Sequence, residues 1–316
     1  TARELGEQLL SLAQSAQDPA FLLEACYTLG ASLFRLGEFT AARSYLEQGI
    51  DFYDPQQHRS RAGSDPGVLC LLHLAWTLWL LGYPDQALHR SHRALTLAQE
   101  LSHPFSLAFA LDFAAEIHRL RREGQAAQKR AEASITLSTE RGFTVWLAAG
   151  TILRGWALAE QGQEEEGITQ MHQGLTTCRV TGVESGQAHY LAMLAEAYGK
   201  VGQTEEGLIL LTEALAFVDK TGERESEAEL YRLKGTLTLQ QFKVQSSRFK
   251  VGESSEFGVL NSESEAEACF HKAIEIARKQ QAKSLELRAA TSLARLWQQQ
   301  GKRKEAHLLL SAIYRW

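Results

Sequence analysis

The chain has 316 residues, with 33 Lys and Arg against 38 Asp and Glu, so its formal net charge at pH 7 is -5. This balance argues against a general nucleic-acid binder, which normally carries a basic excess or a basic stripe. Five prolines and 24 glycines exclude collagen-like and proline-rich low-complexity chains, and the 44% of hydrophobic residues is ample for a core.

The cysteines and the apolar stretches favour a protein of a reducing compartment. Cys26, Cys70, Cys178 and Cys269 are far apart and form no CxxC pair, so neither a disulfide framework nor a zinc ribbon is predicted. The longest apolar stretch, residues 68–81, is too short to span a membrane. The amino terminus carries charges where a signal peptide has an apolar block. We therefore expect a cytoplasmic protein with no membrane partner.

A repeat of about 40 residues runs through the chain, and a small residue opens the second half of each unit. These small residues are 45, 40, 40, 40, 59 and 40 positions apart along the series Ala42, Ala87, Ala127, Gly167, Gly207, Ala266 and Ala306. A second small residue lies in the first half of each unit, in the series Gly30, Ala75, Ala115, Gly155, Ala195, Gly235 and Ala294. Two markers with one period predict paired helices that approach closely where the small residues face each other.

In chain order, the predicted elements are a half unit followed by helix pairs. The half unit comes first, because Ala2 lies forty residues before Ala42. Residues 54–67 are expected to be a polar linker between the first and second pairs. In the third pair, apolar residues follow helical spacing over 104–120, and a turn at 121–124 precedes the second helix.

The sixth unit is longer than the others, and its excess is centred on residues 242–262, which contain the tripeptide FKV twice. We expect a loop insertion between the two helices, because loops accept added length at low entropic cost. A short β-ribbon that docks on a neighbouring surface is the alternative.

The half unit at the start also leads us to expect a piece of a larger protein, since solenoids need polar caps on their outer repeats.

The predicted fold is all-α. It is a right-handed α-solenoid of about seven 40-residue helical hairpins plus an N-terminal half repeat, in a single domain spanning residues 1–316. The small residue at the eighth position of a unit and the alanine at the twentieth resemble the tetratricopeptide repeat.

Longer phrases resemble the C-terminal repeat region of large bacterial multidomain signalling proteins. They are WTLWLLGYPDQALHRSHRALTLAQELSHPFSLAFAL (76–111), GWALAEQGQEEEG (155–167), LAEAYGKVGQTEEGL (194–208) and AKSLELRAATSLARLWQQQGKRKEA (282–306). In that group the repeats follow an ATPase module, often with a class III adenylate/guanylate cyclase domain further upstream. The resemblance carries no catalytic residue onto this chain, because those motifs would lie outside it.

Catalytic and cofactor motifs are absent from the sequence. There is no GxxxxGK[ST], GxGxxG, HExxH or GxSxG motif. His89 and His92, three apart on a helix, could supply half of a metal site, but we interpret them as residues of a solvated face. Cys70 and His73 are interpreted as core residues. We therefore expect no enzymatic activity, no cofactor and no bound metal.

The tetratricopeptide resemblance implies that the first helix of each unit lines an inner groove. The implied positions lie three before, one after and four after the small residue. The candidate partner-binding groove consists of Tyr27, Phe34, Leu72, Trp76, Trp79, Asp112, Glu116, Arg119, Ile152, Trp156, Glu196 and Arg232. We expect Tyr27, Phe34, Trp76 and Trp79 to form one accessible aromatic patch, since tryptophan is favoured in binding hot spots. Burial between neighbouring units is the alternative.

These inferences predict a non-catalytic protein-interaction and regulatory module of a bacterial signalling ATPase or nucleotide cyclase. It would bind a protein segment, or the upstream domains of the same polypeptide, in the groove, and it would not bind nucleic acid. The alternative is the small-molecule sensor domain of a maltose-regulator-like transcription activator.

Overall fold

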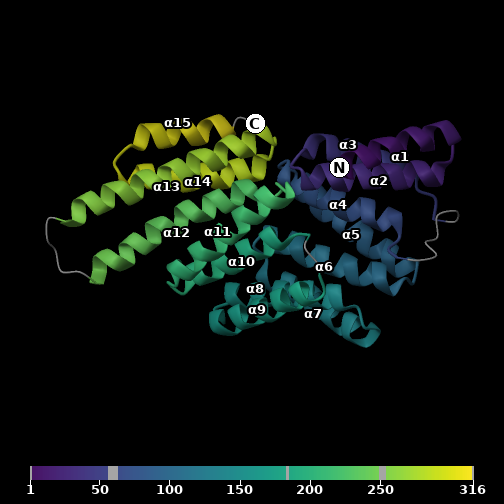
Figure 1. Cartoon of the computed structure of the whole chain (residues 1–316), viewed down its shortest axis with the longest axis horizontal. Helices are drawn as coiled ribbons and strands as arrows, with labels where there is room; N and C mark the ends of the chain where they lie inside the picture. Colours follow the sequence, from purple (N-terminus) through teal and green to yellow (C-terminus); the bar gives the residue numbers. More distant parts are fainter. Residues whose placement is uncertain (1, 56–62, 183–184, 249–253, 315–316) are drawn as a thin grey trace. The chain divides into compact units, whose positions relative to one another are not determined.

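The computed structural model describes residues 2–55, 63–182, 185–248 and 254–314, which form fifteen helices and no strand (Figure 1). The helices group into two compact units, residues 1–185 and 186–316, and the single domain expected from the sequence stays a prediction. No helix in the described ranges is both long enough and apolar enough to cross a membrane.

Unit 1 contains one single helix and four helix pairs. They are α1 (Ala2–Ala16), α2 (Pro19–Arg35) with α3 (Phe39–Phe52), α4 (Pro66–Leu80) with α5 (Pro84–Glu100), α6 (Pro104–Leu120) with α7 (Gly124–Arg141), and α8 (Thr144–Glu160) with α9 (Glu164–Val180).

Unit 2 contains three helix pairs. They are α10 (Gln187–Lys200) with α11 (Thr204–Thr221), α12 (Glu227–Arg248) with α13 (Ser254–Lys279), and α14 (Lys283–Gln299) with α15 (Arg303–Tyr314). Seven pairs preceded by α1 confirm the predicted seven hairpins and half repeat.

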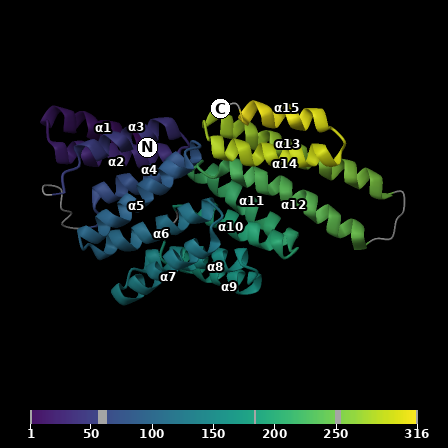
Figure 2. The same cartoon turned by 180° about the vertical axis from the view of Figure 1, so that it is seen from behind.

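Within each unit the pairs stack in chain order. The first helix of each pair packs on its own second helix and on the first helices of the neighbouring pairs, and each second helix packs on the first helix that follows it (Figures 1 and 2). This is the nearest-neighbour packing of a solenoid, in which each repeat buries its apolar face against the next.

The small residues of the two marker series face each other inside the pairs, as predicted. The closest approach is between α8 and α9. A Cβ on Gly167 would lie 2.4 Å from the carbonyl oxygen of Gly155, and a Cβ on Gly155 would lie 2.6 Å from the carbonyl oxygen of Gly167. Between α12 and α13, a Cβ on Gly235 would lie 3.0 Å from the Ala266 carbonyl oxygen. The repeat period is therefore the spacing of helix crossings.

The expected loop at 242–262 is wrong for most of its length, and so is the alternative β-ribbon. Helix α12 continues to Arg248 and α13 starts at Ser254, so the extra residues lengthen both helices to 22 and 26 residues. Both run on beyond the ends of α14 (Figure 1). Residues 249–253 lie outside the described residues. The two helices pack against each other, and packing of this kind supplies most of the stability of helices in proteins.

A buried hydrogen-bond network around Asp65 joins the linker between the first two pairs to α4 and α6. Asp65 caps α4 by accepting from the Val68 N–H (3.0 Å), and its own N–H donates to Ser106 Oγ on α6 (2.8 Å). The Tyr53 hydroxyl at the end of α3 donates to Asp65 Oδ2 (3.1 Å). Asp65 and Ser106 are buried. Three consecutive pairs are thus joined at one point.

We predict that Ser106→Ala lowers the free energy of unfolding by about 1–3 kcal/mol, because the buried N–H of Asp65 loses its acceptor. Urea unfolding followed by circular dichroism measures this. Ser15→Ala is the control, since the exposed Ser15 hydroxyl donates only to the Ser11 carbonyl of its own helix. A loss no larger than in the control would show that the network contributes nothing.

Candidate functional site

The first helices carry every residue of the predicted groove. The placement is Tyr27 and Phe34 on α2, Leu72, Trp76 and Trp79 on α4, Asp112, Glu116 and Arg119 on α6, Ile152 and Trp156 on α8, Glu196 on α10, and Arg232 on α12. Their exposure, however, differs from the prediction.

The predicted accessible aromatic patch is wrong. Trp76 and Trp79 are only 8% and 6% exposed, Phe34 is fully buried, and Tyr27 is half-buried. The Phe34 ring packs on Trp76 at 5.1 Å between centroids. These side chains fill the space between α2 and α4, because large rings bury most apolar area where two first helices meet.

In α4 and α8 the position three residues before the small marker also faces the core. Leu72 and Ile152 are fully buried. Ile152 points at the second helix of its pair, since a Cβ on Gly174 of α9 would lie 2.5 Å from its Cγ1. These two positions therefore belong to the packing of a pair, and a partner cannot reach them in this conformation.

A different set of rings, which sequence reasoning missed, is partly open to solvent. Tyr27, Phe105, Phe113 and Trp146 are half-buried and come from α2, α6 and α8. Phe109 links them, stacking on Trp146 at 4.0 Å and meeting Phe113 edge-on at 4.7 Å between centroids. We call Tyr27, Phe105, Phe109, Phe113 and Trp146, together with His73, the aromatic row. The four-residue spacing of Phe105, Phe109 and Phe113 on one helix is the signal that could have found it.

His73 joins Tyr27 to the other rings of the aromatic row. Its ring lies 5.5 Å from Tyr27 and 5.3 Å from Phe113 between centroids, and its Nδ1 contacts the Leu69 carbonyl at 3.1 Å. Burial, with a smaller contribution from the charge of Arg35, lowers the pKa of His73 to about 4. The imidazole is therefore neutral at neutral pH and serves as an aromatic core residue, as the sequence predicted.

Asp112 is a buried carboxyl group at a position that is apolar in neighbouring pairs. It is 3% exposed, and neither carboxyl oxygen has a hydrogen-bond partner within the described part of the chain. A Cβ on Gly150 of α8 would lie 3.1 Å from its Oδ1, so only glycine leaves it ordinary room there. Burial raises the pKa of Asp112 well above its ordinary value, and the nearby hydroxyl of Ser134 offsets only part of that rise.

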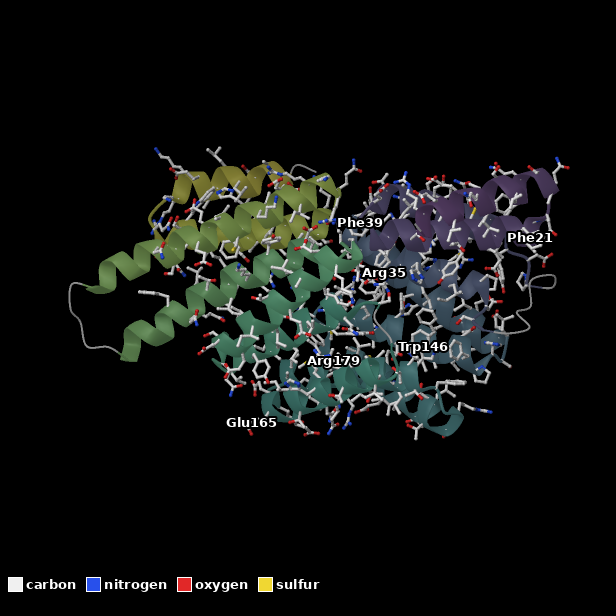
Figure 3. All side chains as sticks on the ribbon, in the orientation of Figure 1. Phe21, Arg35, Phe39, Trp146, Glu165 and Arg179 are labelled. Atoms are coloured by element: carbon white, nitrogen blue, oxygen red, sulfur yellow. The ribbon has the colours of Figure 1, made fainter. Side chains whose placement is uncertain are left out.

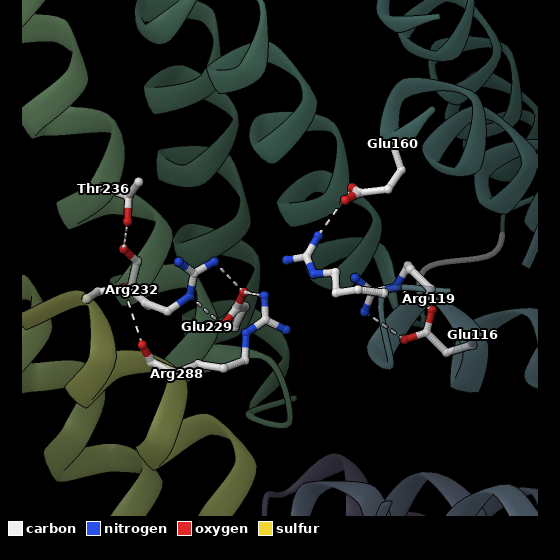
Figure 4. Close-up of polar contacts among 9 residues, drawn as sticks. Glu116, Arg119, Glu160, Glu229, Arg232, Thr236 and Arg288 are labelled. Carbon is white, nitrogen blue, oxygen red and sulfur yellow. Dashed lines mark hydrogen bonds and ion pairs between the residues drawn. The ribbon is translucent and has the colours of Figure 1, made fainter. Parts of the chain in front are cut away.

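A buried ion pair lies further along α6. Arg119 donates two hydrogen bonds to Glu116, at 2.7 and 2.8 Å, in the bidentate geometry favoured by guanidinium and carboxylate (Figure 4). The guanidinium carbons of Arg119 and Arg122 each lie 5.8 Å from the Trp156 ring centroid. The predicted groove residues Glu116, Arg119 and Trp156 are thus brought together as one buried cluster.

Unit 2 carries a similar cluster on its first helices. Glu229 accepts from Arg232 at 2.7 and 2.9 Å and lies 2.8 Å from Nη2 of Arg288 on α14 (Figure 4). Despite the opposing effect of burial, the positive charges of Arg232 and Arg288 lower the pKa of Glu229. Two arginines share one carboxylate, so the cluster ties α12 to α14.

The described residues offer no site for a metal: nowhere among them do three His, Cys, Asp or Glu side chains come together in a way that could hold an ion. The four cysteines are free and buried. Burial raises the pKa of the Cys26 thiol to about 11, which makes this thiol a weak nucleophile.

Comparison with known sequences supports the repeat assignment. Models described as "Tetratricopeptide repeat" match residues 23–53 and residues 68–89. The first match covers most of α2 and all of α3, and the second covers most of α4 and the start of α5. Residues 23–53 and 68–89 are therefore similar to tetratricopeptide repeats. No curated protein matches the sequence.

Solved structures share the arrangement of helices at low sequence identity. The apo form of RapI is 14% identical with a TM-score of 0.55, over 93% of this chain and 97% of that one. A Rap protein complexed with competence and sporulation factor is 13% identical with a TM-score of 0.58, over 95% and 81%. The human IFIT1 dimer with m7Gppp-AAAA is 17% identical with a TM-score of 0.59, over 98% and 62%. The fold is a tetratricopeptide-like α-solenoid.

Proposed function

We propose that this chain is a non-catalytic protein-interaction and regulatory module. The observation that carries the proposal is the aromatic row, because it places half-buried rings from three first helices of unit 1 side by side. Partly exposed aromatic rings on a rigid helical scaffold supply large contact area at low entropic cost, and such rings dominate binding energy in interfaces. The partner is a protein segment with apolar side chains.

The proposal also covers the kind of larger protein in which these repeats occur. The phrases at 76–111, 155–167, 194–208 and 282–306 resemble the repeat region of bacterial signalling ATPases and nucleotide cyclases, which supports a regulatory role beside such domains. The upstream domains of the same polypeptide are then one source of the bound segment. Among the fold relatives, the Rap protein complexed with competence and sporulation factor supports a regulatory ligand on such a scaffold.

We predict that the double variant Phe113→Ala, Trp146→Ala loses partner binding. Peptides selected by display on the native chain should bind the variant at least about tenfold more weakly, the loss of a single hot-spot ring being about 2 kcal/mol. Fluorescence polarisation of labelled peptides measures the affinity, and the melting temperature checks the fold.

Phe21→Ala is the matched control. Phe21 is also an aromatic residue on a first helix, but it is 55% exposed and is not a member of the aromatic row (Figure 3). Equal losses in the control and the double variant would overturn the assignment of the row as the binding surface. Failure to select any peptide that competes for the row would have the same consequence.

A further inference from the structure

A cleft of about 510 Å³ opens in unit 1 among α3, α4 and α5. Its apolar side is formed by Ile50, Leu71 and Leu97, with the ring of Tyr53 beside them. Its polar side is formed by residues of one face of α5, of which His92, Arg93 and Thr96 are central. The volume is in the range of small-molecule sites, which are concave and mostly apolar with a few convergent polar groups.

A local departure from the repeat places the Tyr53 ring at the cleft. Gly67 on α4 lies eight residues before the small marker Ala75, and the residues at the same offset in the other pairs of unit 1 are leucines, Leu22, Leu107 and Leu147. A Cβ on Gly67 would lie 2.6 Å from the ring of Tyr53. The glycine therefore lets the Tyr53 ring lie against α4, where the other pairs hold a leucine side chain.

The polar side of the cleft has an excess of positive charge, although the whole chain is acidic. It belongs to the segment His89–Arg90–Ser91–His92–Arg93. Neither Arg93 nor Arg130 of α7, whose charge acts on His92, has an ion-pair partner within the described ranges. Burial, and after it the charges of His118, Arg130 and His89, lower the pKa of His92. Glu100, at the far end of the same face, is the one acidic side chain that lines the cleft.

We propose that this cleft binds a small carboxylate with an apolar body. The carboxylate lies against Arg93 and His92 and accepts from the Thr96 hydroxyl, while the apolar body covers Ile50, Leu71 and Leu97. Arginine and a hydroxyl are suited to a carboxylate because both donate hydrogen bonds to its oxygens. The site is separate from the aromatic row and does not depend on the proposed protein interaction.

Isothermal titration calorimetry of the full chain with octanoate tests the proposal, with octanol and octylamine as probes of the same chain length. We expect saturable binding of octanoate, weaker binding of octanol and none of octylamine. Arg93→Gln should weaken octanoate binding at least about tenfold, the scale of a charge-assisted hydrogen bond. Thr96→Trp, which places an indole over the cleft, should abolish it.

Arg90→Gln is the matched control, because Arg90 belongs to the same basic segment but does not line the cleft. It should bind octanoate as the native chain does. Equal weakening in Arg90→Gln and Arg93→Gln would show attraction to general positive charge and overturn the site. Absence of saturable octanoate binding, or equal binding of octanol and octanoate, would overturn it as well. The melting temperature of each variant separates lost binding from lost folding.

Discussion

Replacing Gly167 by alanine is expected to destabilise unit 1 by about 2–3 kcal/mol, although alanine is the better helix former. The reason is the contact between α8 and α9. A Cβ on Gly167 would lie 2.4 Å from the Gly155 carbonyl oxygen and 2.8 Å from the Ala159 amide nitrogen. Both are backbone atoms, so the clash is relieved only by moving the helices apart. Gly155→Ala should have a similar effect, and the double variant should be less than additive because both act on one contact. Urea unfolding monitored by circular dichroism measures all three.

Gly124→Ala is the matched control for this prediction. Gly124 opens α7, and a Cβ there would meet its nearest atoms at 3.6 Å, an ordinary van der Waals distance. Its replacement should leave stability unchanged or raise it by about 0.5 kcal/mol through the loss of unfolded-state entropy. If Gly167→Ala were as stable as Gly124→Ala, the close crossing of α8 and α9 would be refuted.

Asp112→Asn is expected to raise the free energy of unfolding by about 2 kcal/mol at neutral pH. The carboxyl group is buried without a hydrogen-bond partner in the described residues, and its ionisation there is opposed by desolvation. The amide has nearly the same size and carries no charge. Asp112→Leu, the residue found at the equivalent position of α4, tests whether an apolar side chain is better still.

The gain in the free energy of unfolding from Asp112→Asn should decrease as the pH falls. The native state holds the Asp112 proton more tightly than the unfolded state does, because its pKa is raised above 3.8. The contribution of Asp112 to the free energy of unfolding is therefore fully present below the ordinary aspartate pKa. It is lost as the pH rises toward the native-state pKa. Asp112→Asn should be free of this fall, so native and variant stabilities converge in acid. A gain that is constant from acidic to neutral pH would contradict the assignment of a buried, protonated carboxyl.

Repeat number and helix boundaries followed from the sequence because they depend on local contacts. The helix expected over 104–120 is α6. The facing small residues, such as Gly155 and Gly167, lie only twelve positions apart. They recur in the sequence because the two consecutive helices of each pair cross closely at these positions. At the longer of the two departures from the period the prediction was wrong. The excess at 242–262 was expected to be a loop, but α12 and α13 pack on each other and continue as helices through most of it.

Which faces of the helices are open was decided by tertiary structure alone. The repeat spacing assigned Trp76, Trp79 and Asp112 to a groove, whereas all three are buried, and the half-buried rings belong to Phe113 and Trp146 instead. A helical period predicts which residues share a face of the helix. The exposure of that face depends on how closely the neighbouring pairs approach and on where long side chains point. The sequence by itself determined the succession of helix pairs and their close crossings. The packing between pairs determined the aromatic row, the buried acid and the cleft beside α5.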